Sequence, residues 1–235
     1  MHLTDSTNLK TPSQPLIPGL DLKSFLKFAI NPTDTQAVFD IQASMLKAPN
    51  RSEMIASTVT ALESSDTFME LYRQRYIPEF PTTEDLLAQP EGSLGRIVGN
   101  HLKSNGIRLD FAGLNLDMIY LREMNLLTYI AIRGLRIHDI IHAVLGLGVS
   151  PIDEYAHASF TLAQYHSPFH MMIVASGNLH TAFYEPSEIP RFLETTNRYY
   201  RMGASAAFIT GYDFENNFAT PMMEVRRQLR LPDVL

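Results

Sequence analysis

The apolar residues of this chain recur at every third or fourth position, and no segment alternates apolar with polar residues over five or more positions. A spacing of three or four residues follows one face of an α-helix, whereas strict alternation is typical of a half-buried β-strand. β-Branched clusters are scarce, and neither a repeat of 20–50 residues nor a low-complexity tract is found. With 235 residues, 45% of them hydrophobic, the chain is long enough to bury a core. We therefore expect an all-α protein.

Prolines, glycines and polar capping residues divide the sequence into segments. Residues 1–20, rich in proline, are predicted to be a flexible N-terminal arm, and residues 21–235 a single multi-helix domain. Residues 78–90 contain three prolines and are expected to be an extended connector. The expected helices cover residues 22–29, 34–47, 50–64, 66–77, 93–105, 120–146, 168–184, 187–212 and 221–230, with a further one that starts at Ser150.

Composition excludes several classes of protein. The chain has no cysteine, which rules out disulfides, thiolate zinc sites, iron–sulfur clusters and a cysteine nucleophile. Its formal net charge is −6, whereas a general nucleic-acid binder usually carries a basic surplus. We expect no nucleic-acid partner, and any bound metal must use histidine, aspartate or glutamate.

The longest stretch without an acidic or basic side chain other than histidine runs from Tyr155 to Tyr184. Asn178, Pro168 and four histidines interrupt it, so a pair of buried helices is expected rather than a membrane span. The N-terminus has no apolar run of signal-peptide length and no arginine in its first 20 residues. The expected location is cytoplasmic, with peripheral membrane association as an option.

Chemistry is concentrated in one segment that contains His138, Asp139 and His142, followed after eleven residues by Glu154. Histidines at i and i+4 lie one turn apart on a helix, where two imidazoles can bind one divalent ion, and Asp139 shares their arc. The turn at Gly146–Pro151 lets the next helix fold back, so that Glu154 could add a carboxylate. This donor set suits Zn²⁺, Mn²⁺ or Fe²⁺. Ordinary core histidines are the competing interpretation; the adjacent Asp and Glu favour the metal.

Other polar residues are expected to be structural or solvent-exposed. Four further histidines share no helical spacing that would bring them to one metal, and the arginines of the last helix are expected to form a solvated face. These residues are His101, His166, His170 and His180, and Arg226, Arg227 and Arg230.

The helix that carries the histidines also presents apolar and small residues on the same face. Leu127, Ala131, Leu135 and Leu145 are the candidate lipid-binding residues. Such a face indicates either close packing between helices or an apolar groove that ends at the metal. The small residues of segment 203–207 point to close packing as well. A groove of this kind would suit an amphiphile with a polar head.

Two motifs resemble a known family. Residues 138–154, HDIIHAVLGLGVSPIDE, match the HDxxH-x11-E signature of the coenzyme Q (ubiquinone) biosynthesis protein that is fourth in the Coq series. Residues 90–96, PEGSLGR, resemble a segment that the family carries upstream of that signature. The resemblance runs from about Pro18 to Leu231 and is loose outside the two motifs. After Gly211-Tyr212-Asp213-Phe214 the chain departs from the family's basic run, and it has no tryptophan.

The resemblance implies an all-helical, dimeric domain that binds polyprenylated intermediates in an apolar channel between helices. It also implies a divalent metal, usually zinc, held by His138, Asp139, His142 and Glu154, with Mg, Mn and Fe as alternatives. The family is described both as an organiser of other quinone-biosynthesis proteins and as a lyase that removes the ring C1 carboxylate. In the lyase, His138, Asp139 and His142 would be the catalytic residues. The absence of a transit peptide suggests a bacterial-type relative.

Three alternatives to the lyase stay open. A scaffold that holds an isoprenoid lipid without turnover would need the same pocket. A metal-dependent phosphohydrolase also uses an HD doublet, with His101 and Asp213 as candidate partners. A zinc peptidase would place Asp139 where HExxH has glutamate, and its shorter side chain argues against that option.

Overall fold

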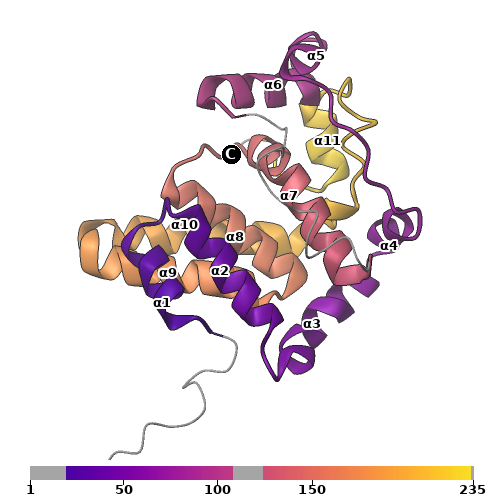
Figure 1. The fold of residues 1–235 in the computed structure, drawn as a ribbon. Helices are drawn as coiled ribbons and strands as arrows, with labels where there is room; N and C mark the ends of the chain where they lie inside the picture. Colours follow the sequence, from indigo (N-terminus) through magenta and orange to yellow (C-terminus); the bar gives the residue numbers. More distant parts are fainter. Residues whose placement is uncertain (1–19, 108–123, 234–235) are drawn as a thin grey trace, which may run out of the picture.

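The computed structural model describes residues 20–107 and 124–233. In these two ranges the chain forms eleven α-helices, two short 3₁₀ helices and no β-strand, which confirms the all-α prediction (Figure 1). The helices are α1 (Leu22–Ile30), α2 (Thr35–Leu46), α3 (Arg51–Glu63), α4 (Asp66–Arg73), α5 (Thr83–Leu87), α6 (Leu94–Asn105), α7 (Leu126–Leu145), α8 (Pro151–Tyr165), α9 (Pro168–Tyr184), α10 (Ile189–Ser205) and α11 (Met222–Gln228), with 3₁₀ turns at Pro186–Glu188 and Ile209–Gly211.

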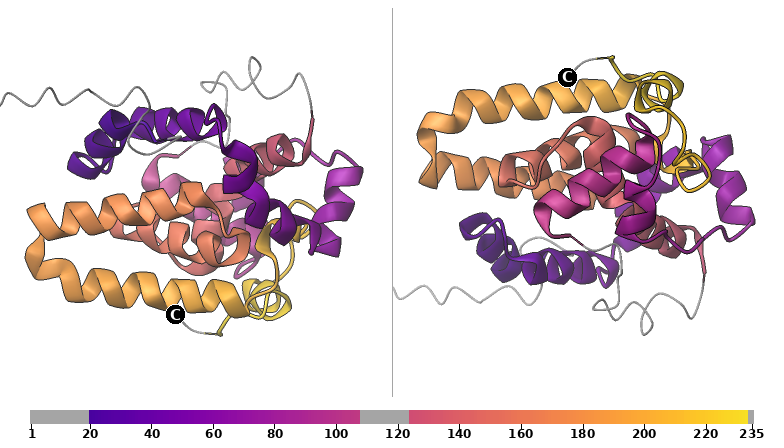
Figure 2. Two further views of the ribbon diagram at one scale, coloured as in Figure 1. Left: turned by 90° about the horizontal axis from the view of Figure 1, so that it is seen from below. Right: turned by 90° about the horizontal axis from the view of Figure 1, so that it is seen from above.

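Helix α8 is the centre of a helical layer. It packs against both α9 and α10, which run side by side as a hairpin in Figure 2, while α1 and α2 lie against α9. Helix α7 crosses the middle of the molecule, and α6 and α11 lie beside its upper end in Figure 1. The stretch 155–184 therefore forms the predicted pair of helices, α8 and α9, separated by a turn at His166 with φ of 51°.

Helices α8 and α10 approach closely at Gly203. A methyl group there would overlap the carbonyl oxygen of Phe160, so only glycine allows this contact. The small residues predicted to mark close packing do so at this position. Backbone contact of this kind fixes α8, and with it the side chains that α8 presents to α7.

Three clusters of buried apolar side chains form the core. The largest joins α6, α7, α8, α10 and α11, the second joins α1, α2, α8 and α9, and the third lies where α3 and α4 meet the start of α7. Fully buried members of the largest cluster include Val98, Ile137, Ile141 and Phe160. Since α7 and α8 contribute to this cluster from facing sides, apolar burial holds the two helices together.

Several boundaries differ from the sequence prediction. The expected extended connector at 78–90 contains α5, because Thr82 and Asp85 form a capping box that nucleates a helical turn despite the flanking prolines. The helix expected over 187–212 ends at Ser205. The start of the helix expected over 120–146, and all but the last residue of the predicted arm, lie outside the described residues.

The prediction of a solvated arginine face on α11 is wrong for Arg226. Its guanidinium is buried and donates to the carbonyl oxygens of Val144 and Pro232. It thus caps the C-terminal carbonyls of α7, where positive charge is favourable. Arg227 and Arg230 are exposed, as expected.

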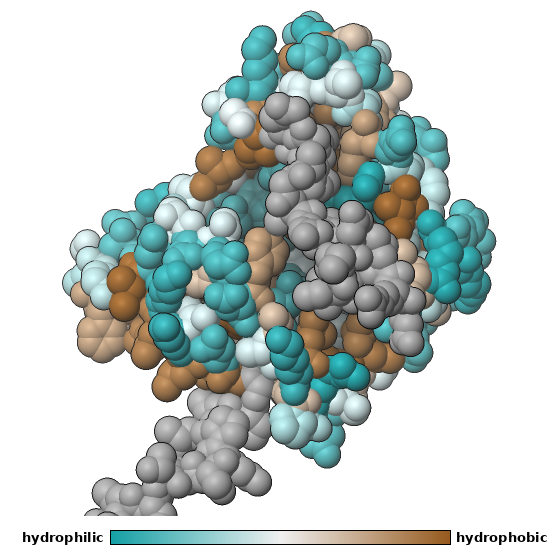
Figure 3. Space-filling model, viewed as in Figure 1, coloured by the Kyte–Doolittle hydropathy of each residue, from teal (hydrophilic) through white to brown (hydrophobic). Residues whose placement is uncertain are grey.

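None of the helices in the described ranges is long and apolar enough to span a bilayer. Figure 3 shows hydrophobic side chains on the lower left of the molecule, on the side where α1 and α9 lie. The exposed apolar residues of these two helices include Leu22, Leu26, Ile30 and Phe183.

Candidate metal centre

Helix α7 places two histidines one turn apart. The side chain of Asn125 caps its first turn, and Gly146, with φ of 69°, ends it in the left-handed conformation that glycine adopts without strain. His138 and His142 fall in its last three turns and point to the same side. The sequence prediction of an i, i+4 pair is therefore realised.

A short loop turns the chain from α7 into α8. Ser150 and Asp153 form a capping box, and Pro151 occupies the first turn, where its missing N–H costs nothing. These signals set the start of α8 and therefore the position of Glu154 in its first turn. The loop brings the carboxylate back across from the two histidines.

The carboxylate of Glu154 lies between the two imidazoles. Its Oε2 is 3.4 Å from Nε2 of His138 and 3.6 Å from Nε2 of His142. A charge-assisted N–H···O bond is about 2.7–2.9 Å long, so these contacts are longer than good hydrogen bonds. Two ligands of one tetrahedral zinc ion, each about 2.0–2.2 Å from it, are about 3.4 Å apart. The spacing is that of two ligands around a common ion.

The orientation of His142 leaves one nitrogen for a ligand. Its Nδ1 donates to the carbonyl oxygen of Gly148 at 2.7 Å, which turns Nε2 toward Glu154. The side chain is 1% exposed, and in the described part of the chain no group lies within hydrogen-bond distance of Nε2. A backbone carbonyl that orients the remote nitrogen is the usual support of a metal-binding histidine. His138 is more open, with its side chain 33% exposed.

Charge and burial act against each other at these groups. Burial lowers the pKa of His142, but Glu154, the carbonyl of Gly148 and the charge of Asp139 together raise it by more, so that the net shift is upward. Burial likewise raises the pKa of Glu154, and His138 and His142 together outweigh it, which holds that carboxyl well below its ordinary range. The cluster therefore favours positive charge beside Glu154, whether a proton or a metal supplies it.

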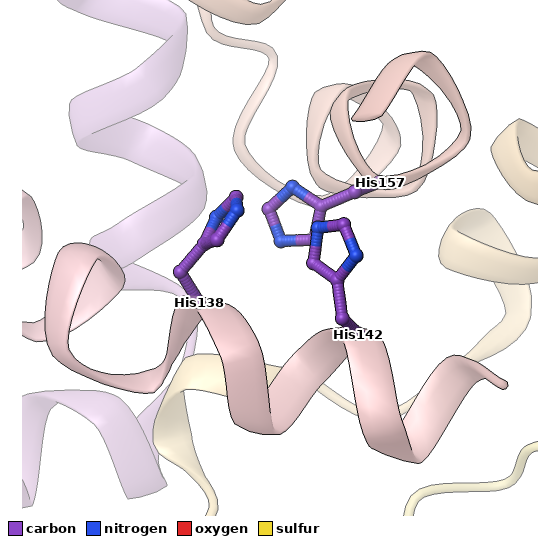
Figure 4. Close-up of side chains that lie close together, drawn as sticks. All are labelled: His138, His142 and His157. Atoms are coloured by element: carbon purple, nitrogen blue, oxygen red, sulfur yellow. The ribbon is translucent and has the colours of Figure 1, made fainter. Parts of the chain in front are cut away.

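A third histidine, which the sequence analysis missed, completes the cluster. His157 projects from α8 toward His138 and His142, as Figure 4 shows, and ligand nitrogens of the three residues lie within 4.8 Å of one another. Burial and the neighbouring imidazoles lower the pKa of His157 well below its ordinary value. A signal was present: Glu154 and His157 form an ExxH pair, whose i, i+3 spacing puts both on one helical face.

The remaining candidate polar residues divide between the site and other regions. The ring of His101, from α6, lies 6.2 Å from that of His142, and burial lowers its pKa. Asp139 is partly exposed, and its charge raises the pKa of both His101 and His142. Asp213, by contrast, accepts hydrogen bonds from Tyr76 and Asn216. The two candidate partners of a phosphohydrolase are therefore engaged in different networks.

The four candidate lipid-binding residues of α7 have two kinds of environment. Leu127, Ala131 and Leu135 are half-buried, and a methyl group added at Gly134 would meet no atom of the described residues within 4 Å. Leu145 is completely buried in the largest core cluster. The half-buried three precede His138 along the helix at intervals of about one turn. A surface hollow of about 430 Å³ elsewhere on the molecule is lined by none of these residues.

Comparison with known proteins shows which family the chain belongs to. Residues 71–234 match the sequence model described as coenzyme Q (ubiquinone) biosynthesis protein Coq4. The chain belongs to the Coq4 family. The match covers both the PEGSLGR segment and the HDxxH-x11-E signature, and so confirms the resemblance that those motifs indicated.

Two further comparisons agree with this membership. The chain is 26% identical over 160 residues to the ubiquinone biosynthesis protein COQ4 homolog 2, mitochondrial, of Paramecium tetraurelia, an alignment that covers 68% of this chain and 73% of the relative. A crystal structure of a Nostoc punctiforme PCC 73102 protein attributed to ubiquinone biosynthesis superposes with a TM-score of 0.73. It shares 21% identity, with 88% of this chain and 95% of that chain covered, and so shows the same fold.

Proposed function

We propose that this Coq4-family protein binds a polyprenylated intermediate of ubiquinone biosynthesis at a divalent metal, zinc being the best fit, and removes the ring C1 carboxylate. The proposed ligands are His138, His142 and Glu154. Asp139 is the second candidate carboxylate, since its charge acts on His142. The proposal applies the chemistry of the family to residues that this chain brings together.

The observation that carries the proposal is the spacing at Glu154. Its Oε2 stands 3.4 and 3.6 Å from two imidazole nitrogens, and the nitrogen of His142 is buried without a hydrogen-bond partner among the described groups. A buried polar atom without a partner costs about 1–3 kcal/mol, a cost that a bound metal would offset. Imidazole and carboxylate are the donors that zinc, manganese and iron prefer in a chain without cysteine.

The protein residues would orient the substrate's head group. When bound, a divalent metal would act as a Lewis acid toward the ring carboxylate. His142, held by Gly148, and Glu154, held by the α8 capping box, are fixed by the fold, which is the preorganisation that catalysis requires. Loss of CO₂ would leave the bonding electron pair on the ring carbon, which then takes up a proton.

The half-buried face of α7 supports an isoprenoid tail. Leu127, Ala131 and Leu135 lead along the helix toward His138, and the open space at Gly134 leaves room beside them. An apolar face that ends at a polar cluster matches an amphiphile whose ring is polar and whose tail is not. The partner would be a prenylated lipid handed on by other quinone-biosynthesis proteins.

Turnover tests the proposal directly. Metal-loaded wild type and Asp139→Ala would be incubated with a polyprenyl hydroxybenzoate, and CO₂ release and ligand binding measured in parallel. The lyase proposal predicts CO₂ release by wild type and its loss in the variant. If both proteins bind the lipid and neither releases CO₂, the protein is a lipid-binding scaffold and the lyase proposal is wrong.

A further inference from the structure

His157 stands in the same cluster as the proposed metal ligands but outside the HDxxH-x11-E signature. It lies three residues after Glu154 on α8, so both side chains leave the helix on the face that meets α7. Figure 4 shows its ring directed at the space between His138 and His142. Two helices thus supply two site residues each.

The three imidazoles are close enough to share one ion. The ring of His157 lies 4.4 Å from that of His138 and 4.9 Å from that of His142, and the rings of His138 and His142 lie 4.6 Å apart. Ligand nitrogens of all three lie within 4.8 Å of one another. Ligands of a tetrahedral ion are about 3.4 Å apart, so small side-chain rotations bring the three nitrogens into range.

No hydrogen bond within the described residues engages Nε2 of His157. The residue is 8% exposed, and its Nε2 has no hydrogen-bond partner among the residues that the structure describes. Half-buried His170 also has a nitrogen, Nδ1, without a hydrogen-bond partner among these residues, but it lies edge-on between the rings of Tyr165 and Phe169, at 5.7 and 5.2 Å, and next to no candidate metal ligand. His157 instead faces two imidazoles, His138 edge-on at 4.4 Å and His142 stacked at 4.9 Å, so its neighbours are themselves candidate metal ligands.

We propose that His157 is a direct metal ligand, so that the ion is held by three imidazoles and the carboxylate of Glu154. This inference rests on the proposed metal site and deepens it. A set of three nitrogens and one oxygen favours Zn²⁺, Fe²⁺ or Co²⁺, whereas Mg²⁺ and Ca²⁺ prefer oxygen ligands. The site would therefore discriminate against magnesium more strongly than one built from two histidines and two carboxylates.

The test compares His157→Gln with His142→Gln and Asp139→Asn, with the half-buried His170→Phe as the control. Each metal-free protein is titrated with Zn²⁺ by calorimetry and with Co²⁺ by visible absorption. We expect His157→Gln to weaken Zn²⁺ binding by at least about tenfold, since loss of a supporting residue alone costs about 10–100-fold, and to change the spectrum of bound Co²⁺. His170→Phe should leave both unchanged, and excess Mg²⁺ should not displace Co²⁺ from wild type.

The outcomes separate this inference from the proposed function. If His157→Gln binds Zn²⁺ as wild type does, with the same Co²⁺ spectrum, while His142→Gln loses binding, the metal site stands and His157 is a packing residue. If wild type binds no metal, both proposals fail. Side-chain ¹⁵N signals of wild type give a check that needs no variant to fold: Zn²⁺ should shift three histidines, and a shift of only two would overturn the inference.

Discussion

Helix α7 carries two polar clusters, and they differ in whether the protein satisfies them. At Arg133, every guanidinium nitrogen has a partner: Nε donates to the carbonyl of Thr210, Nη1 to Glu215 at 2.6 Å, and Nη2 to Glu215 and the carbonyl of Tyr212. Two to three turns further along α7, His142 meets His157 of α8, and the buried Nε2 atoms of both have no hydrogen-bond partner among the described residues. The hydrogen bonds of the first cluster are complete, whereas the second leaves two buried nitrogens free for the proposed metal.

The contrast separates a structural role from a binding role on one helix. Arg133 and Glu215 are 2% and 5% exposed, and their network holds the segment after α10 against α7. The histidine cluster contributes no comparable internal bonds, and its geometry is fixed instead by the surrounding core and caps.

The largest expected effect comes from breaking the complete cluster. Arg133→Ala should destabilise the protein by about 3–5 kcal/mol, because it leaves the buried carboxylate of Glu215 without its partner. Urea unfolding measures the change. Arg73→Ala, which removes an exposed ion pair with Glu70, is the control and should cost less than about 1 kcal/mol. Equal effects of the two variants would contradict the structural role of Arg133.

The incomplete cluster should show its effect only when metal is present. At free Zn²⁺ of about 100 times its Kd, wild type should gain about 2.7 kcal/mol of stability over the metal-free protein. His142→Ala should lose that gain, which a thermal melt with and without Zn²⁺ would detect. A variant that still gains stability from Zn²⁺ would place the binding site elsewhere.

A half-buried histidine outside both clusters separates the effect of desolvation from that of metal binding. Burial lowers the pKa of His170 to about 3 from its ordinary 6.5. Below about pH 6.5 the unfolded chain therefore binds a proton at this histidine, whereas the folded protein does not. The free energy of unfolding thus falls as the pH drops below about 6.5, by at most about 1.4 kcal/mol per pH unit. His170→Phe should flatten the pH dependence of urea unfolding between pH 6.5 and 4, with metal content unchanged. An unaltered slope would show that His170 is open to solvent in the folded state.

The smallest effect on stability is expected at the half-buried face of α7. Leu135→Gln should cost less than about 1 kcal/mol, because its side chain is only partly buried, yet it should reduce the amount of isoprenoid that copurifies. Leu145→Ala should have the opposite pattern, because Leu145 is completely buried. It should lower the free energy of unfolding by about 2–5 kcal/mol and have no direct effect on a bound lipid. Mass spectrometry of the extracted lipid checks both variants. Unchanged lipid in Leu135→Gln would remove this face from the proposed channel.

Local rules explain what the sequence predicted well. The spacing of His138 and His142, the stop at Gly146 and the start at Ser150 depend on neighbouring residues, so the pair and its opposing Glu154 could be derived before the fold was known. His157 obeys the same local rule through its ExxH spacing, although it lies outside the HDxxH-x11-E signature, which ends at Glu154.

Tertiary contacts explain what the sequence analysis missed. Arg226 looked like part of an exposed basic face, and only the approach of α11 to the end of α7 buries it against Val144. His101 comes next to His142 from a helix some forty residues earlier, which no local spacing encodes. The short α5 formed within a proline-rich segment because one capping box outweighed the prolines.

Native mass spectrometry of the protein as purified, with His142→Ala beside it, tests the central claim most directly. If the histidine cluster is a metal site, wild type carries one divalent ion per chain, the variant carries none, and His170→Phe retains it. A wild-type chain that stays bare after incubation with Zn²⁺ would contradict the account and leave the three histidines as an unusual feature of the core.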